Sequence, residues 1–140
     1  MSRRRVVVTG MGMVTPLGNN VKDTWDNVLE GKSGVSDITV FDASQFSTRF
    51  AAQVSNFDAS DYMSVKEARK MDLFIQYGMA ASLQALEDAQ INQDTVDLTR
   101  VGCAIGSGIG GLPMIEKNVG LLNESGPKRI SPFFVPGAII

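Results

Sequence analysis

The sequence of 140 residues contains no histidine and a single cysteine, Cys103. The absence of histidine excludes general acid–base catalysis by an imidazole of this chain and a Cys–His nucleophilic pair. One cysteine cannot form an internal disulfide, and without histidine it cannot build a zinc cluster of the usual ligands. The chain is therefore poor in the side chains that most often carry out chemistry.

Excess charge and long apolar runs are missing as well. Lys and Arg number 13 against 15 Asp and Glu, a net charge of −2, which gives no general attraction to nucleic acid. No stretch approaches the ~20 apolar residues of a membrane helix, and the valines at 6–8 are too few for a secretory signal. We therefore expect a cytoplasmic protein with neither nucleic acid nor membrane as a partner.

A strand, a glycine turn and a helix occur twice along the chain. The β-branched residues 5–9 predict a strand buried on both faces, and Val21, Trp25 and Leu29 have the spacing of an amphipathic helix that Gly31 ends. Residues 101–105 predict a second strand, followed by glycines and a helical pattern over 112–122. Alternation of this kind is typical of a layered α/β domain.

The residues between these two units predict one irregular layer and one long helix. Residues 32–62 have mixed signals, with only 51–54 resembling a strand. Ser64 and Glu67 have the spacing of a capping box, which predicts a helix start. Residues 75–89 carry an apolar stripe (Ile75, Met79, Leu83, Leu86) and a stripe of small residues (Gly78, Ala81, Ala85, Ala89). A helix with both stripes should be buried, with close backbone approach at the small residues.

Two features have a chemical and a structural interpretation. The glycines at 106, 108 and 111 match the G-x-G-x-x-G pattern of dinucleotide sites, but no strand with an acidic end follows. Tight turns and close packing are the favoured explanation, with a nucleotide-binding oxidoreductase as a distant alternative. Cys103 lies within the apolar segment 101–105, so we expect a packed core thiol and not a nucleophile.

Cations gather at two places in this nearly neutral chain. Lys66, Arg69 and Lys70 have the i, i+3, i+4 spacing that would place them on one side of a helical turn. Lys128 and Arg129 form a second pair in a turn rich in glycine and proline. Ordinary solvated charge and docking of an acidic partner both fit this pattern.

The last ten residues carry no charge and are apolar to the end. A surface with that much exposed apolar area would bind a partner. Either this segment inserts into another subunit, or the natural chain continues beyond Ile140. We expect the second, with residues 1–140 forming the N-terminal part of a larger domain.

Four motifs in order resemble the bacterial type II β-ketoacyl-[acyl-carrier-protein] synthases, the elongating condensing enzymes. They are VVVTGMG at 6–12, KMD at 70–72 with FIQYG at 74–78, GSGIGG at 106–111 and ISPFFVP at 130–136. Together they cover the chain from end to end, and the last two are the most specific.

This resemblance implies a thiolase-like layered α/β fold, of which this chain would be the N-terminal portion, and a homodimer. It implies acyl transfer to a cysteine, decarboxylation of malonyl-carrier protein and Claisen condensation, in fatty-acid elongation, without an organic cofactor or metal. In this family the nucleophilic cysteine and both histidines lie beyond the matched positions. The segment alone is then expected to be inactive.

The residues that carry over are binding residues. Ile109 matches a residue that lines the fatty-acyl pocket, and Phe134 matches one that reaches this pocket across the dimer interface. Lys66, Arg69 and Lys70 match positions that dock the acidic acyl carrier protein, loaded with acyl or malonyl groups. Lys128 and Arg129 resemble a second basic patch, supplied by the partner subunit.

A non-catalytic interaction module with a ketosynthase-like sequence is the alternative from another functional class. Its natural end would be Ile140, and the intact mass of the native protein would distinguish it from a longer enzyme. The acyl chain length and the distinction from polyketide ketosynthases stay open.

Overall fold

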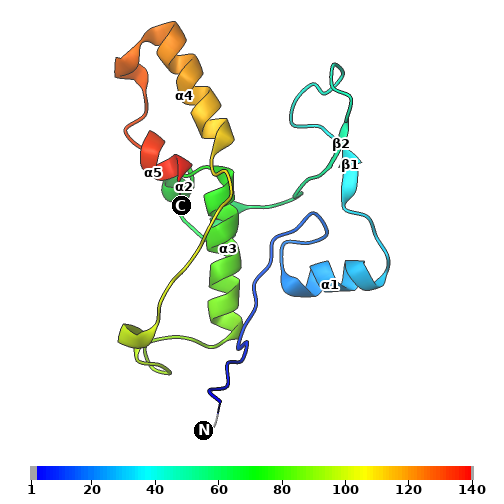
Figure 1. The fold of residues 1–140 in the computed structure, drawn as a ribbon, viewed down its shortest axis with the longest axis vertical. Helices are drawn as coiled ribbons and strands as arrows, with labels where there is room; N and C mark the ends of the chain where they lie inside the picture. The colour runs from blue at the N-terminus through cyan, green and yellow to red at the C-terminus, as the bar shows by residue number, and fades with distance from the viewer. Residues whose placement is uncertain (1–2, 140) are drawn as a thin grey trace. The chain divides into compact units, whose positions relative to one another are not determined.

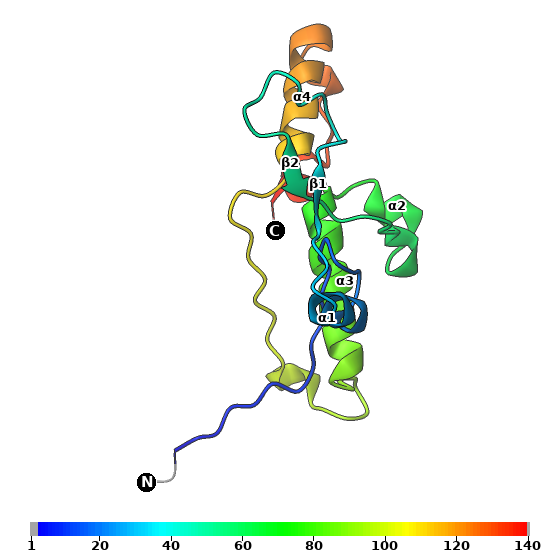
Figure 2. The ribbon, with the colours of Figure 1, turned by 90° about the vertical axis from the view of Figure 1, so that its right-hand side faces the viewer.

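The computed structural model describes residues 3–139 and is mainly helical (Figures 1 and 2). It has five α-helices, three short 3₁₀ helices and two short strands among the described residues. In chain order these are α1 (Val21–Leu29), β1 (Val35–Asp37), β2 (Phe50–Ala52), η1 (Ala59–Asp61), α2 (Val65–Ala68), α3 (Leu73–Asp88), η2 (Leu98–Arg100), α4 (Leu112–Ser125), η3 (Pro127–Arg129) and α5 (Phe134–Ala138). No helix in the described range is both long and apolar enough to cross a bilayer.

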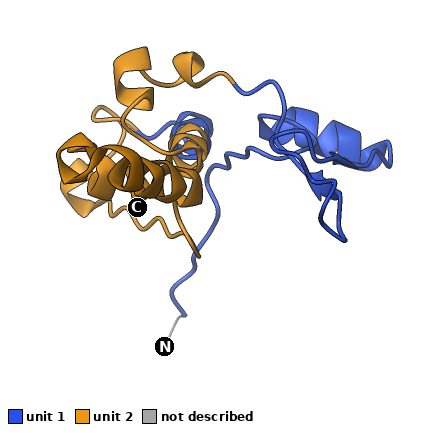
Figure 3. Ribbon diagram, turned by 90° about the horizontal axis from the view of Figure 1, so that it is seen from above, with its two compact units in different colours: residues 1–57, 81–91 blue, residues 58–80, 92–140 orange. Residues whose placement is uncertain are grey.

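The chain divides into two compact units, which we describe separately (Figure 3). Unit 1 comprises residues 1–57 and 81–91, and unit 2 comprises residues 58–80 and 92–140. The helix α3 supplies its second half to unit 1 and its first half to unit 2.

In unit 1, the predicted helix at 21–29 is confirmed as α1. Asn20 caps it, because the Asn20 side chain accepts a hydrogen bond from the backbone N–H of Asp23 at 2.8 Å. The region predicted to be irregular contains a two-stranded antiparallel sheet in which Val35 lies opposite Ala52 and Asp37 opposite Phe50. The strand expected at 51–54 is therefore shifted toward the N-terminus, and its partner β1 was not predicted.

The small-residue stripe of α3 fulfils its predicted role in unit 1. Residues 10–13 run along the helix, and the N–H groups of Met11 and Met13 donate to Asp88 and Gln84 at 2.9 and 3.0 Å. A Cβ atom at Gly12 would collide with the Ala81 carbonyl oxygen, and one at Gly10 would lie 2.5 Å from the Ala89 nitrogen. Only glycine permits this backbone-to-backbone approach.

The apolar stripe of the same helix is not buried, contrary to the sequence prediction. Met79, Leu83 and Leu86 are each exposed, whereas Ala80, which belongs to neither stripe, is fully buried. The prediction was wrong because helical spacing indicates which residues share a face, but only a neighbouring element can cover that face.

The strands predicted at 5–9 and 101–105 do not form. Both segments are extended without ladder hydrogen bonds, and Figure 2 shows the second as a long trace leading toward α4. Val6 is 90% exposed. A strand needs a hydrogen-bonded neighbour, and β1 and β2 are the only strands that pair within residues 3–139. Cys103 is correspondingly exposed, so the predicted packed core thiol is wrong for this structure.

Candidate functional site

The first group of predicted site residues lies around α2 in unit 2. The helix begins where the sequence predicts, because Ser64 and Glu67 form a complete capping box. The Ser64 hydroxyl accepts from the Glu67 N–H at 3.3 Å, and a Glu67 carboxylate oxygen accepts from the Ser64 hydroxyl at 2.6 Å and from its N–H at 3.2 Å. Hydrogen bonds from the Ser64 side chain and then its backbone hold the pKa of Glu67 below its ordinary value.

The helix ends after four residues, which changes the predicted arrangement of the cations. Lys66 lies within α2, Arg69 is its C-cap, and Lys70 lies in the turn before α3. The side-chain amide of Gln76, from α3, donates at 3.0 Å to the carbonyl oxygens of both Ala68 and Met71. It thereby satisfies carbonyls that the short helix leaves free. The expected single helical turn with three cations is therefore a short helix followed by a turn.

These cations are available to a partner. Lys66 and Arg69 are exposed and Lys70 is half-buried. The ion pairs found within residues 3–139 are both in unit 1, so none of the three cations forms an ion pair in that range, and Lys70 acts on Glu67 only at longer range. The ammonium of Lys70 lies 4.9 Å from the centroid of the Phe133 ring, a cation–π contact between the turn and the segment before α5.

The second basic pair lies on η3, directly after α4. Gly126, with φ of 78°, ends α4, and Lys128 and Arg129 follow on the exposed 3₁₀ turn. A positive φ favours glycine, which explains the residue found at this helix end. Like the first cluster, this pair forms no ion pair within the described residues.

The two predicted acyl-pocket residues lie on segments that the structure brings together. Ile109 is in the glycine turn before α4 and is 76% exposed, and Phe134 is the first residue of α5 and is half-buried. The N–H of Gly111, two residues after Ile109, donates to the Ala138 carbonyl at 3.0 Å. The turn and α5 are therefore joined directly through their backbones.

Asp72 is the residue at the centre of this junction, and the sequence analysis included it only as part of a motif. It is 8% exposed, and its carboxylate accepts from the Met114 N–H in the first turn of α4 at 2.8 Å. Its own N–H donates to the Gly137 carbonyl of α5 at 2.9 Å. A sequence signal exists in α4, because its N-cap residue, Gly111, has no side chain to cap the helix, so an acceptor has to come from another element.

Asn118 is a second residue that the sequence analysis missed. It is 4% exposed, and its side chain donates to the Met114 carbonyl at 2.8 Å and accepts from the Ser131 N–H at 3.1 Å. Asn118 therefore fixes the start of the segment that leads to Phe134. Its position in the middle of an amphipathic helix gave no indication of this contact.

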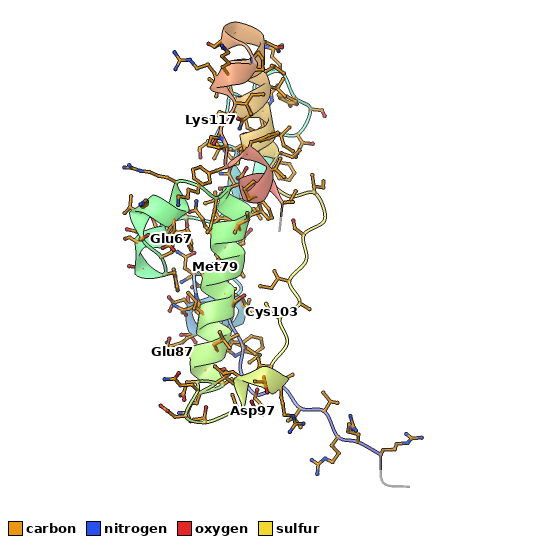
Figure 4. All side chains as sticks on the ribbon, turned by 90° about the vertical axis from the view of Figure 1, so that its left-hand side faces the viewer. Glu67, Met79, Glu87, Asp97, Cys103 and Lys117 are labelled. Atoms are coloured by element: carbon orange, nitrogen blue, oxygen red, sulfur yellow. The ribbon has the colours of Figure 1, made fainter. Side chains whose placement is uncertain are left out.

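The remaining chemistry-bearing residue, Cys103, lies on the extended segment before α4 (Figure 4). Within the described residues it makes no disulfide, and no group of three or more Cys, Asp or Glu side chains could hold a metal ion. The carboxylate of Asp58, the residue before η1, accepts a hydrogen bond from the Ser60 hydroxyl, and this hydrogen bond lowers the pKa of Asp58.

Unit 1 contains an apolar hollow of about 510 Å³ that includes none of the predicted site residues. It lies between residues 11–13 and α1, with Met11, Met13 and Trp25 in its lining. No sequence pattern predicts this hollow.

Comparison with known proteins adds a family match over nearly the whole chain. Residues 3–139 match the family model described as "Beta-ketoacyl synthase, N-terminal domain". The chain is 58% identical to the 3-oxoacyl-[acyl-carrier-protein] synthase 2 of Vibrio harveyi and 54% identical to that of Coxiella burnetii, each over 140 residues. It spans about a third of these relatives, since 34% of each is covered.

Solved structures of ketosynthases resemble the fold. The AntDE:AntF complex, described as a type II PKS acyl-carrier protein with its ketosynthase bound to the hexaketide, matches with a TM-score of 0.75 and 32% identity. The match covers 99% of this chain and 35% of the matched chain of that complex. A β-ketoacyl synthase from Burkholderia phymatum matches with a TM-score of 0.75 and 30% identity, over 96% of this chain and 34% of its own. The expected fold class, the N-terminal portion of a thiolase-like α/β fold, is confirmed.

Proposed function

The chain belongs to the β-ketoacyl synthase family and matches its N-terminal domain. We propose that it is the N-terminal part of a 3-oxoacyl-[acyl-carrier-protein] synthase that elongates fatty acids. The observation that carries the proposal is the 54–58% identity to synthases of this name along all 140 residues. This identity favours the synthase over a non-catalytic interaction module. In such a synthase, residues 1–140 would be the N-terminal part of the ketosynthase domain.

The proposed reaction is an acyl transfer followed by a decarboxylative condensation. The acyl group moves from a carrier-protein thioester to an enzyme thiolate, which releases the carrier thiol. Malonyl-carrier protein then loses CO₂, and the resulting enolate attacks the acyl carbonyl and expels the thiolate. This chain contains no imidazole for these steps, and its one thiol is exposed on an extended segment. We therefore assign this chain a role in binding and positioning the substrates. We expect the 140-residue chain alone to have no condensing activity.

The acyl pocket is the first of these binding roles. Ile109 and Phe134 are apolar, as the recognition of an alkyl chain requires. In the proposed homodimer Phe134 would reach the pocket of the partner subunit, and the hydrogen bond between Gly111 and Ala138 joins the two segments that carry these side chains within each subunit. A homodimer is part of the proposal, and the exposed apolar residues Phe133, Val135 and Ile139 beside Phe134 support it.

Docking of an acyl carrier protein is the second role. Lys66, Arg69 and Lys70, with Lys128 and Arg129 as a second patch, would bind its acidic surface. Their lack of ion pairs within the described residues supports this assignment, because no such pair would have to be broken for a carrier protein to bind. The ketosynthase of the AntDE:AntF complex is itself described in complex with an acyl-carrier protein.

A chimaeric synthase provides the test, with this chain replacing the matching N-terminal third of the Vibrio harveyi relative. It should convert acyl- and malonyl-carrier protein to 3-oxoacyl-carrier protein. Lys66→Glu should raise the KM for carrier protein about 2- to 30-fold, since a surface ion pair contributes about 0.2–1 kcal/mol and the change also adds repulsion. It should also weaken the dependence of KM on salt.

The matched control is Lys117→Glu. Lys117 is an exposed lysine of α4 in the same unit, outside both basic groups (Figure 4). The same change of charge there should leave KM nearly unaltered. Equal effects of the two variants would contradict the docking role, and a chimaera without condensing activity would contradict the proposed function itself.

A further inference from the structure

Three segments of unit 2 meet at one buried carboxylate. Asp72 lies between the turn that carries Lys70 and the start of α3. It binds the first turn of α4 through its side chain and α5 through its backbone N–H, at 2.8 and 2.9 Å. Figure 1 shows α5 beside the start of α3, in agreement with these contacts.

The packing at this junction is tight around two glycines. A Cβ atom at Gly111 would lie 2.6 Å from a carboxylate oxygen of Asp72 and 3.0 Å from the Cα of Ala138. A Cβ atom at Gly137 would collide with the Lys70 carbonyl oxygen and lie 2.9 Å from the sulfur of Met114. Real Cβ atoms do not approach so closely, so both positions require glycine for steric reasons.

The contacts of Asp72 reach both segments that carry the proposed acyl-pocket residues. Ile109 lies two residues before Gly111, whose N–H binds Ala138, and Phe134 lies three residues before Gly137. The other end of the Phe134 segment is held by Asn118 through the N–H of Ser131. The junction therefore fixes Ile109 and Phe134 from a common point.

The charge of Asp72 suits this role. The first N–H groups of a helix have no partner within the helix, and the helix dipole places partial positive charge there. Because Gly111 cannot cap α4, the buried carboxylate supplies the missing acceptor from another element. A hydrogen bond to a charged group is stronger than one between neutral groups, so its loss should release α4 and the glycine turn together.

We propose that Asp72 is a positioning residue that sets the acyl chain-length preference of the synthase by holding the Ile109 turn and the Phe134 helix in one arrangement. The proposal rests on the proposed function, because it assumes that each acyl pocket of the homodimer is lined by Ile109 of one subunit and Phe134 of the other, both held by the Asp72 of their own subunit. Long acyl groups, which reach both side chains, depend on this arrangement more than short ones do.

The test compares acyl primers of six and fourteen carbons in the chimaeric synthase. Asp72→Ala should lower the ratio of kcat/KM for the long primer to that for the short primer about tenfold, while kcat with the short primer stays within about threefold. Asp72→Asn keeps the side-chain volume and one acceptor oxygen, so it should restore part of the ratio. A purely structural role would lower kcat/KM for both primers alike and leave their ratio unchanged.

A second variant alters the same junction at Gly111, the residue that faces the Asp72 carboxylate. Gly111→Ala keeps the carboxylate but pushes it away, so it should lower the same ratio even if Asp72→Ala proves insoluble. The control is Asp97→Ala, which removes an exposed carboxylate that accepts from Thr99 at 3.0 Å in the same unit. This variant should leave the ratio unchanged.

An unchanged ratio in both Asp72→Ala and Gly111→Ala would overturn the proposal, as would an equal fall in Asp97→Ala. Both results require that the parent chimaera condenses both primers. A parent chimaera that condenses neither primer would instead overturn the proposed function. The failure of the two proposals can therefore be distinguished.

Discussion

Gly12→Ala tests the close approach between residues 10–13 and α3 in unit 1. The added Cβ would overlap the Ala81 carbonyl oxygen and lie 2.8 Å from the Ala85 nitrogen. Both atoms belong to the helix backbone, so no side-chain rotation can relieve the collision. Residues 10–13 would have to move away from α3.

The cost follows from the contacts that this movement breaks. Met11 donates to the carboxylate of Asp88, and Met13 donates to the side-chain oxygen of Gln84. A hydrogen bond to a charged group contributes about 1.5–3 kcal/mol, and one between neutral groups about 0.5–1.5 kcal/mol. Overpacking by a methyl group costs about 1–3 kcal/mol in general. Moving away breaks both hydrogen bonds, about 2–4.5 kcal/mol together, and relieves the overpacking, so we expect the segment to be destabilised locally by about 3 kcal/mol.

Amide hydrogen exchange of the chimaeric synthase, followed peptide by peptide, measures this local cost. A loss of about 3 kcal/mol should speed exchange of the Met11 and Met13 amides about a hundredfold. The control is Gly120→Ala in α4, where a Cβ meets nothing within 4 Å. There alanine should slow exchange about 2- to 5-fold, because glycine weakens a helix by about 0.5–1 kcal/mol. Equal exchange in Gly12→Ala and the parent would refute the packing argument.

Three further changes test other parts of the structure. Hydrogen bonds from Ser64 lower the pKa of Glu67 below 4.5, so the capping stability is complete above about pH 4.5 and is lost as the pH falls through the lowered pKa. The difference in Tm between Glu67→Gln and the parent should accordingly shrink below pH 4.5, and a constant difference would contradict this linkage. Asn118→Ala should cost about 1–3 kcal/mol because it leaves the Ser131 N–H unpaired, whereas Asn123→Ala, at an exposed position of α4, should leave Tm unchanged in scanning calorimetry. Ile109→Trp should shorten the longest acyl chain found in product analysis, whereas the control Val119→Trp, a change at another exposed side chain, should not. Products of equal length from the two variants would argue against an acyl-pocket role for Ile109.

Local sequence rules predicted most of the helices. The cap at Asn20, the capping box at Ser64 and the glycine at 126 act within a few residues of the helix they limit, so their effect can be read without knowing the fold. The small-residue stripe of α3 was also informative, since a row of alanines indicates close approach by any neighbour. Here the neighbour is the backbone at Gly10 and Gly12.

The predictions failed where an element depends on a distant partner. Residues 5–9 and 101–105 have the composition of strands, but strand formation requires a hydrogen-bonded neighbour, and residues 3–139 place none beside them. Burial of Met79 and of Cys103 failed for the same reason, because their exposure depends on what covers them. The helix carrying Lys66 was expected to extend further, and Gln76 from α3 caps it early.

By itself, the sequence determined most of the helices of this protein, the two groups of cations and the family, because capping, periodicity and ordered motifs are local properties of the chain. Only the tertiary structure decided that Asp72, Gly111 and Gly137 meet at one buried point. Residues 72 and 111 are separated by 39 positions, and no local pattern encodes a contact over that distance. The acceptor that α4 lacks in its own sequence is supplied by packing, which brings a charged side chain to a helix end that needs one.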